Sequence, residues 1–408
     1  MPLVTDLDLP ALDLSDPGLA GDRFHAVLDG LTASGHWLAA SPLATVVLDR
    51  AAGEFFLKTR AAIFPGHKIA EIFGIADGPL YEEISRNIIN VNGDDHRRLR
   101  SLVSPSLSMR AADSYRPAMR GFMSDLWAAV EPAGRCEFVA TVAKPYPSQT
   151  IATVMGAPIQ DAGRLHDWSM WIQRQFDPIA LINEREAIEA KVAEFYAWVR
   201  PLIERRRSDP ADDLISTLIA AEQDGDRLSD VELENLVLNV LVGGVDTTQS
   251  QLAHAVRLLA ERPEQWAALR ADPQRMAQQA VEEALRYEPV TPFTARIMVE
   301  EVTYRDVTFP RDAVVMVCAL TGNRDAATFE RPEEFDITAG RATARQLTFG
   351  AGIHFCLGAN LARAELQEGL AFLARRVSAL ELDGDPVAQS ASGIHGLDAL
   401  PIRFTPAA

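Results

Sequence analysis

The ten residues from Phe349 to Gly358, FGAGIHFCLG, place a cysteine between a glycine turn and an expected helix. Gly350 and Gly352 predict a tight loop, and Cys356 is expected to lead directly into the helix. Backbone N–H groups and the positive end of the dipole at a helix N-terminus favour the thiolate, the form of cysteine that binds metals. Gly358 has no Cβ, so it leaves room for a flat cofactor or a close backbone. Taken alone, the cysteine would fit better as a buried free thiol, which is the more common environment.

The complete pattern resembles the haem-binding loop of the cytochrome P450 superfamily, FxxGxHxCxG, and matches every defining position. The resemblance implies that the protein binds heme b (iron protoporphyrin IX) and that Cys356 is the proximal ligand of the iron. In that family the thiolate pushes electron density toward the iron and favours cleavage of the O–O bond. By the same resemblance, Phe349 packs under the porphyrin, Gly358 lies against the cofactor and His354 contacts a haem propionate.

A helix of unusual length is expected from about residue 230 to residue 261. Ser229 and Glu232 form a capping-box pattern at its start, and apolar residues follow at helical spacing. Pro263 is expected to close it. A helix of this length would cross the whole molecule.

Two adjacent glycines, Gly243 and Gly244, stand inside this helix, where each costs about 1 kcal/mol relative to alanine. Close packing or a kink would explain them, and so would a local opening that holds a small ligand. The run GGVDTT resembles the AGxDTT element with which the family activates oxygen, with Gly243 in place of alanine. The resemblance implies that Thr247 hydrogen-bonds dioxygen or its water and that Asp246 relays protons from solvent. This acid–alcohol pair suits the chemistry, because the distal oxygen needs two protons before the O–O bond is cleaved.

Glu283 and Arg286 lie three residues apart in a further expected helix, which Asp272 caps. Alone, such a pair is typical of a solvated surface. It resembles the family's ExxR element, whose role is structural, because it braces the region that carries the cysteine loop. The chain departs from the usual bacterial pattern downstream, and either Arg341 or Arg345 could complete the bracing network.

His96 and Arg100 stand four residues apart, on one face of an expected helix. Spacing alone would favour a solvated basic turn. The pair resembles the family's HxxxR element, whose side chains bind haem propionates, and a guanidinium fork suits a carboxylate. Arg296 resembles the third propionate partner.

Composition excludes several classes of protein. The net charge of −18 argues against broad nucleic-acid binding and against adhesion to an anionic membrane. The three cysteines are far apart and form no CxxC pair, which gives no support to a zinc site and suits a reducing compartment. The first residues lack the pattern of a secretory signal, and no run of about 18 apolar residues occurs. We expect no association with the membrane and a cytoplasmic location.

The organisation of the chain predicts one large domain, 1–408, because no repeat, low-complexity tract or long linker divides it. Short β-like runs are expected at 36–50 and 299–320, and most of the remainder has helical periodicity. The fold class is therefore mainly α with a minor β region. The resemblance implies the cytochrome P450 fold, a triangular helical prism, with haem between the long helix and the helix that follows Cys356.

The resemblance further implies a monooxygenase, an oxidoreductase that inserts one oxygen atom of O2 into a hydrophobic small molecule and releases the other as water. The same resemblance suggests where a substrate pocket would lie, and most of its residues are apolar. It would include Ile88, Ile89, Val91, Leu241, Gly244, Val245, Val290, Phe293 and Ile394, with Trp171 and Phe176 as a cap and His395 as either a polar contact or an ordinary surface residue. Apolar residues of this kind more often form a protein core than contact a ligand.

No flavin or iron–sulfur motif occurs, so electrons are expected from a separate ferredoxin, supplied by a ferredoxin reductase and NAD(P)H. A basic docking patch is expected on the cysteine side, formed by Arg97, Arg98, Arg110, Arg345 and Arg363. Two other functions stay open. A peroxide-driven peroxygenase would need no electron partner, but the Asp246–Thr247 pair argues against it. A haem-thiolate protein that binds a ligand without turnover is the alternative outside enzymes.

Overall fold

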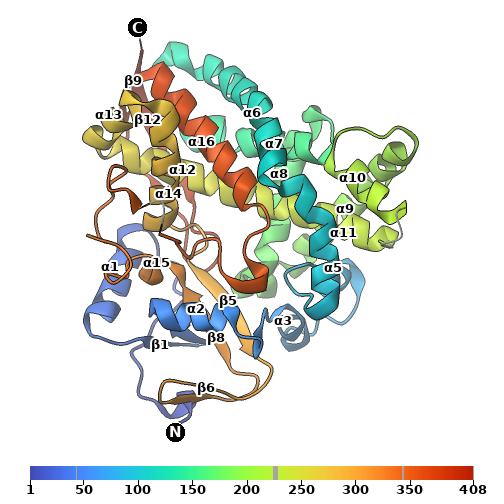
Figure 1. Cartoon of the computed structure of the whole chain (residues 1–408), viewed down its shortest axis with the longest axis vertical. Coiled ribbons are helices and arrows are strands. Elements are labelled where there is room, and N and C mark those ends of the chain that lie inside the picture. The colour runs from blue at the N-terminus through green and yellow to red at the C-terminus, as the bar shows by residue number, and fades with distance from the viewer. Residues whose placement is uncertain (43, 224–227, 342–343, 408) are drawn as a thin grey trace.

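The computed structural model describes residues 1–42, 44–223, 228–341 and 344–407. Helices form most of the molecule, and a smaller β region lies at the end that holds the N-terminus (Figure 1). This confirms the predicted class, mainly α with a minor β region. The α-helices are α1 (Gly21–Ala33), α2 (Arg50–Lys58), α3 (Gly66–Ile72), α4 (Gly78–Arg86), α5 (Gly93–Val103), α6 (Met109–Val130), α7 (Pro145–Met155), α8 (Ala162–Gln173), α9 (Pro178–Ser208), α10 (Leu214–Gln223), α11 (Asp230–Gly244), α12 (Asp246–Ala260), α13 (Pro263–Ala271), α14 (Pro273–Tyr287), α15 (Ala319–Gly322) and α16 (Ala359–Arg376).

The expected long helix is present as two helices, α11 and α12, that follow one another. Its start is as predicted, because Ser229 and Glu232 form the reciprocal capping box. The interruption falls at Val245, whose φ of −95° and ψ of −67° lie at the edge of the helical range. The Thr247 hydroxyl donates to the Gly243 carbonyl at 2.8 Å and so gives that carbonyl a partner at the break.

The other two expected helices are α14 and α16. The Asp272 side chain caps α14 by accepting from the Arg275 N–H group, as the sequence predicted. Helix α16 begins at Ala359, so Cys356 lies three residues before the helix and not directly at its entrance. Helix α16, which follows the cysteine loop, packs against α6, α12 and α14.

The main sheet joins distant parts of the chain in the order β1-β2-β8-β5-β3. Its strands are β1 (Leu38–Ser41), β2 (Ala44–Val47), β3 (Ala62–Ile63), β5 (Phe293–Met298) and β8 (Val314–Cys318). Strands β2 and β8 pair in parallel with Val46 opposite Met316, and the other pairs are antiparallel. Both predicted β runs are therefore confirmed, and β5 adds a strand that begins before the second run.

Three smaller sheets are also present, and one of them lies away from the main sheet. Strand β12 (Pro401–Pro406) lies between β4 (Arg135–Glu137) and β9 (Val377–Leu382), and β9 and β12 lie at the end of the molecule that holds the C-terminus (Figure 1). Strands β6 (Val302–Tyr304) and β7 (Val307–Phe309) form a hairpin, and β10 (Val387–Ala388) pairs with β11 (Leu397–Ala399). The loop between β10 and β11 returns toward the helical part, where it contributes to the site described below.

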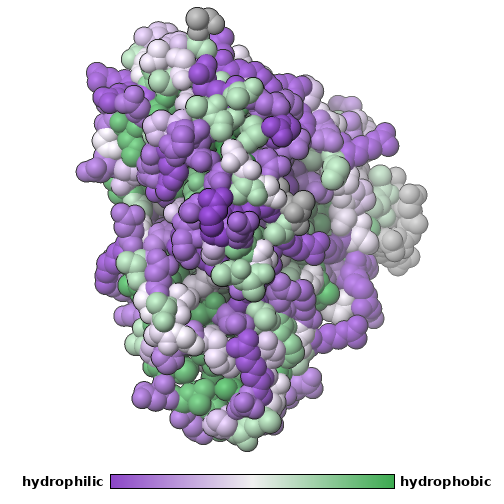
Figure 2. Space-filling view, turned by 60° about the vertical axis from the view of Figure 1, so that its left-hand side comes forward, coloured by the Kyte–Doolittle hydropathy of each residue, from purple (hydrophilic) through white to green (hydrophobic). Residues whose placement is uncertain are grey.

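The hydrophobic core is largest among the helices, and two smaller clusters lie in the β region. One face of the surface is mostly hydrophilic, and hydrophobic side chains gather toward its lower end (Figure 2). Among the described residues, no helix is both long and apolar enough to cross a bilayer.

Candidate active site

The cysteine loop is held by backbone contacts that only glycine allows. Gly350 and Gly352 have φ values of +69° and +74°, in the left-handed region that side chains disfavour. A Cβ on Gly352 would lie 2.6 Å from the Leu57 carbonyl oxygen, so the loop packs directly on α2. The Cys356 N–H group donates to the Phe349 carbonyl at 2.9 Å, which closes the loop. These contacts fix the backbone of the loop and therefore the direction in which the Cys356 side chain points.

The electrostatics of Cys356 differ from the expectation of a stabilised thiolate. Burial raises the pKa of the thiol, and the Gly358 N–H group together with the Arg100 and Arg363 cations offsets only part of this effect. The helix that would favour the thiolate starts at Ala359, two residues later than expected, which weakens its influence. A bound metal cation would supply the missing stabilisation, because a coordinating thiol is deprotonated by the metal's own charge.

Cys356 opens onto a cavity of about 410 Å³. The cysteine loop forms one wall, and α11 with α12 forms the wall opposite. A Cβ added to Gly243 on α11, or to Gly358 beside the cysteine, would meet no atom within 4 Å. Both glycines therefore face open space, which agrees with room for a flat group between the two walls.

Four side chains with cationic capacity meet at this cavity, namely His96, Arg100, Arg296 and His354. The rings of His96 and His354 lie 4.5 Å apart, and Arg100 donates to the Phe355 carbonyl at 2.6 Å. His96 is 1% exposed, and neither of its ring nitrogens has a partner among the described residues. Arg296 is 3% exposed, and its guanidinium donates to the carbonyl of the adjacent Ala295.

The pKa values of this cluster show that it lacks negative charge. Burial lowers the pKa of Arg296 to about 10. Burial, followed by repulsion from His96, Arg296 and Arg100, lowers the pKa of His354 to about 3. Buried cations normally have an anionic partner. The cluster therefore fits an anionic group in the cavity, such as the two propionates of haem.

The two residues expected to handle protons lie at the break between α11 and α12. Thr247 lines the cavity, whereas Asp246 is outside the lining, 5% exposed, with its Oδ1 atom lacking a partner among the described residues. Burial raises the pKa of Asp246 to about 6, against the opposing influence of Lys144 and Arg174. A carboxyl group with this pKa can both take up and release a proton near neutral pH.

The structure places most of the expected substrate residues on the cavity and leaves others outside. Those that line it are Ile88, Ile89, Gly244, Val290, Phe293, Ile394 and Phe176. Leu241 and Val245 lie outside, because both are fully buried in the helical core. Val91 and Trp171 are also outside and pack against the helical core. His395 is not a lining residue, since it is buried in a separate polar cluster.

Sequence reasoning missed several polar residues on the cavity. Asn239 and Gln251 lie four residues before Gly243 and four after Thr247, so helical spacing from either could have found them. Phe64 also lines the cavity from the N-terminal part of the chain, and no pattern in the sequence points to it. A further hollow of about 720 Å³ lies between α8 and α9 and contains none of the expected site residues.

Glu283 and Arg286 form a buried ion pair, with side chains 3% and 2% exposed. The Arg286 guanidinium donates twice to Glu283, at 2.8 and 2.9 Å. It also donates to the carbonyls of Asn323, Pro332 and Glu334. All five of its N–H groups therefore have acceptors, and the pair ties α14 to the segment that leads to the cysteine loop.

Arg341, and not Arg345, joins this network. The Arg341 guanidinium donates to Glu283 at 2.6 Å and to the backbone carbonyls of Glu330, Arg331 and Glu334. The Arg345 side chain is exposed, and its guanidinium lies over the Phe355 ring at 5.5 Å. Of the two arginines that the sequence left open, Arg341 is therefore the one that completes the bracing network.

The expected basic patch is partly neutralised. Arg97 pairs with Asp94, Arg98 with Glu232 and Arg363 with Glu282. Arg110 and Arg345 are exposed. The positive charge on the cysteine side is thus smaller than a count of arginines suggests.

Comparisons with known proteins agree with this geometry. The family model described as Cytochrome P450 matches residues 166–392. The chain is 34% identical to luteothin monooxygenase of Streptomyces thioluteus, over 97% of this chain and 96% of that protein. It is 36% identical to cyclomarin C epoxidase of Salinispora arenicola, over 78% and 80% of the two chains. The crystal structure of CalO2 superposes with a TM-score of 0.90 at 29% identity, covering 98% of this chain and 100% of that one.

The chain belongs to the cytochrome P450 family. Its fold is the P450 fold, and members of the family bind heme b through a cysteine thiolate. The protein is a haem-thiolate monooxygenase that uses O2 to oxidise a small molecule, and such enzymes generally need a redox partner.

Proposed function

We propose that Cys356 is the proximal ligand of the haem iron. We also propose that a hydrophobic small molecule is oxidised in the cavity between the cysteine loop and the α11–α12 break. One observation carries the assignment: Cys356 shares a cavity with the buried Arg296 guanidinium and the buried His96 ring, and neither has an anionic partner among the described residues. His96, Arg100 and Arg296 would bind the propionates. His354 would lie beside them, Phe349 would pack under the porphyrin, and Gly358 would leave it room.

When bound, the haem supplies the redox chemistry that activates O2. The protein's own residues position the reactants and move protons. Thr247 holds a hydroxyl on the cavity wall, and Asp246 exchanges protons between solvent and that wall. The lining around Val290, Phe293 and Ile394 is apolar, which favours a hydrophobic substrate. The network of Glu283, Arg286 and Arg341 holds the segment that leads to the cysteine loop.

Replacing Cys356 by serine tests the ligand. The variant is expected to lose the red-displaced absorption band of the reduced, carbon-monoxide-bound protein, because serine offers oxygen in place of sulfur. A Cys318→Ser variant is the matched control, since Cys318 is buried and lies outside the cavity. An unchanged band in Cys356→Ser would contradict the assignment.

The substrate class is testable by screening hydrophobic compounds for the low-spin to high-spin change in the haem spectrum. Compounds that cause the change should then be oxidised by the reconstituted system of ferredoxin, ferredoxin reductase and NAD(P)H. Turnover with peroxide alone at the same rate would favour a peroxygenase. Binding without product would favour a ligand-binding protein.

The electron donor we propose is a ferredoxin, which docks on the cysteine side near Arg110 and Arg345. Arg345 is the stronger candidate, because it is exposed and contacts Phe355, the neighbour of Cys356. Arg345→Glu should slow reduction severalfold and weaken its salt dependence, since charge complementarity acts mainly on the association rate. Arg403→Glu, on β12, is the control and should reduce at the normal rate. Equal rates in both variants would contradict this docking site.

We also propose that the protein is cytoplasmic and that the chain forms a single domain. Three free cysteines suit a cytoplasmic protein. The contacts of α16 with α6, α12 and α14 support a single domain over residues 1–408.

A further inference from the structure

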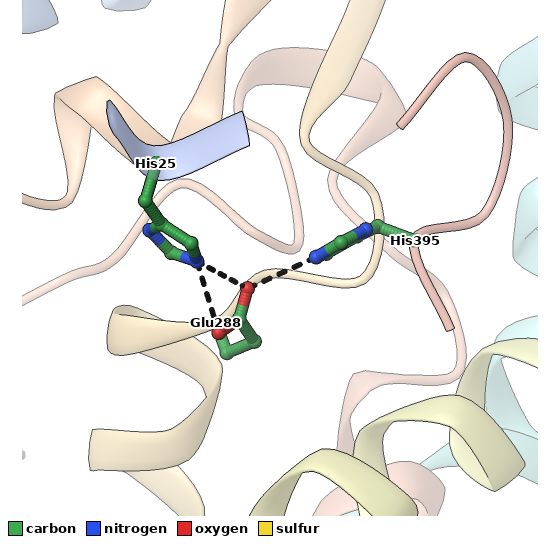
Figure 3. Close-up of side chains that lie close together, drawn as sticks. All are labelled: His25, Glu288 and His395. Carbon is green, nitrogen blue, oxygen red and sulfur yellow. Dashed lines mark hydrogen bonds and ion pairs between the residues drawn. The ribbon is translucent and has the colours of Figure 1, made fainter. Parts of the chain in front are cut away.

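A buried carboxylate outside the cavity joins three separate segments of the chain. Glu288 follows the last residue of α14, His25 comes from α1, and His395 comes from the loop between β10 and β11. The two histidines approach Glu288 from different sides (Figure 3). Glu288 Oε1 lies 2.9 Å from His25 Nε2 and 3.1 Å from His395 Nε2. Glu288 and His395 are each 1% exposed.

Two histidines and a glutamate could hold a metal ion, but the neighbouring arginines exclude this. Arg324 Nη2 lies 2.7 Å from His25 Nδ1. A guanidinium can only donate, so His25 Nδ1 must accept and the ring proton must be on Nε2, facing Glu288. Arg257 donates to Glu288 Oε2 at 2.7 Å. A cation at this point would meet an N–H group and two arginines, so the cluster is a hydrogen-bonded joint.

The joint is centred on an ionised carboxylate. Burial disfavours the charge of Glu288, but hydrogen bonds from His25 and His395 outweigh burial and hold its pKa well below the usual value. The carboxylate therefore accepts from His25, His395 and Arg257 together. Bonds of this charge-assisted kind are about twice as strong as neutral ones.

His395 is also held through its backbone. Its N–H group donates to the Val290 carbonyl at 2.8 Å, and its carbonyl accepts from His254 Nε2 at 3.0 Å. The rings of His254 and His395 stack at 5.1 Å. Burial lowers the pKa of His254 to about 3, so this histidine is neutral and acts as a donor here.

The joint connects two parts of the cavity wall. Val290 lies two residues after Glu288, and Ile394 immediately precedes His395, and both line the cavity. The bond between the Glu288 and His395 side chains therefore acts together with the backbone bond from His395 to Val290 to hold two wall residues that belong to different segments. His25 holds the same carboxylate from α1 and does not line the cavity.

We propose that Glu288 and His395 are positioning residues that set the separation of Val290 and Ile394 and so determine which molecules the cavity accepts, an inference that rests on the proposed function. Neither residue touches the substrate. Their effect is expected to grow with the size of the ligand, because only a ligand that reaches the wall senses its position.

Two nitrogen ligands of the haem iron provide the test. Imidazole is small enough to bind the iron without filling the cavity, whereas 4-phenylimidazole extends toward the wall. The ratio of their dissociation constants, measured from the shift of the haem absorption band, cancels differences in haem content. The variants are His395→Leu, which removes the donor, His395→Gln, which keeps an N–H donor, and His25→Gln as the matched control at the same carboxylate.

The ratio is expected to change about tenfold or more in His395→Leu, the effect of one ill-fitting group in an apolar pocket. It should return close to the wild-type value in His395→Gln and stay there in His25→Gln. Glu288→Gln, which keeps the side-chain volume and loses the charge, should change the ratio in the same direction as His395→Leu and serves if that variant does not take up haem.

Normal imidazole binding with an unchanged ratio in His395→Leu and Glu288→Gln would overturn the inference alone. An equal change in His25→Gln would also overturn it, because the effect would then reflect general loosening. The absence of any shift with imidazole in the wild-type protein would overturn the proposed function together with this inference.

Discussion

Replacing Arg341 by glutamine tests the bracing network, because the chain offers Arg345 as a neighbour outside that network. The Arg341 side chain is 7% exposed and donates to Glu283 and to three backbone carbonyls. Its loss would leave those carbonyls short of a donor. Glu283 would still accept two bonds from Arg286 and one from the Asp336 N–H group at 2.9 Å.

The magnitude follows from what remains. Removing one partner of a buried ion pair costs about 3–5 kcal/mol when the other charge is left without compensation. Glu283 keeps Arg286, so the loss should be closer to that of a hydrogen bond to a charged group, about 1.5–3 kcal/mol. We therefore expect Arg341→Gln to lower the free energy of unfolding by about 2–3 kcal/mol, with Arg286→Gln above that range. Arg345→Gln loses an exposed cation–π contact, about 0.5–1 kcal/mol.

Urea unfolding followed by far-UV circular dichroism measures these differences. Equal slopes of the transitions would show that the variants differ in stability and not in the surface exposed on unfolding. The order of the midpoints should be wild type, Arg345→Gln, Arg341→Gln and Arg286→Gln, from highest to lowest. If Arg345→Gln proved as unstable as Arg341→Gln, the assignment of the network would be wrong.

Three further predictions concern the α11–α12 break. The folded-state pKa of Asp246 is about 6, against an ordinary value of 3.8, so the free energy of unfolding falls as pH rises between these two values. Asp246→Asn should abolish that fall and be about 3 kcal/mol more stable near pH 7, while turnover drops about a hundredfold, as unfolding curves and rates against pH will show. Thr247→Ala should lower the product formed per NAD(P)H consumed about tenfold, and Thr247→Ser should retain most of it. Gly244→Ala should destabilise by about 1–3 kcal/mol, because its Cβ would lie 2.4 Å from the Ile151 side chain, whereas Gly243→Ala should gain about 0.5–1 kcal/mol in the same urea assay.

Much of the fold could be predicted because the decisive signals are local. The capping box at Ser229 and the cap at Asp272 both form as expected, since each depends on residues within one helical turn. The two glycines in the long helix made a kink one of the interpretations that the sequence left open. Its place at Val245 depends on the hydrogen bond from Thr247 to Gly243, which spacing alone does not reveal.

The site was less predictable where packing decides which way a side chain faces. Leu241 and Val245 were expected on the cavity and lie in the core, because the rotation of α11 is set by its neighbours. Burial raises the pKa of the Cys356 thiol more than the nearby N–H group and arginines lower it, so its thiolate depends on the metal it binds, which the glycine loop alone does not reveal. His395, which the sequence left as either a substrate contact or a surface residue, is buried and bonds Glu288, which is distant in sequence.

The parallel pairing of β2 with β8 has a consequence for biosynthesis. Arg50 and Arg100, from the first quarter of the chain, reach the carbonyls of Arg345 and Phe355. These partners leave the ribosome 295 and 255 residues after the respective arginines do. The nascent chain therefore cannot enclose its prosthetic group while it is being translated, and uptake belongs to the last stage of folding, after the C-terminal segment has emerged.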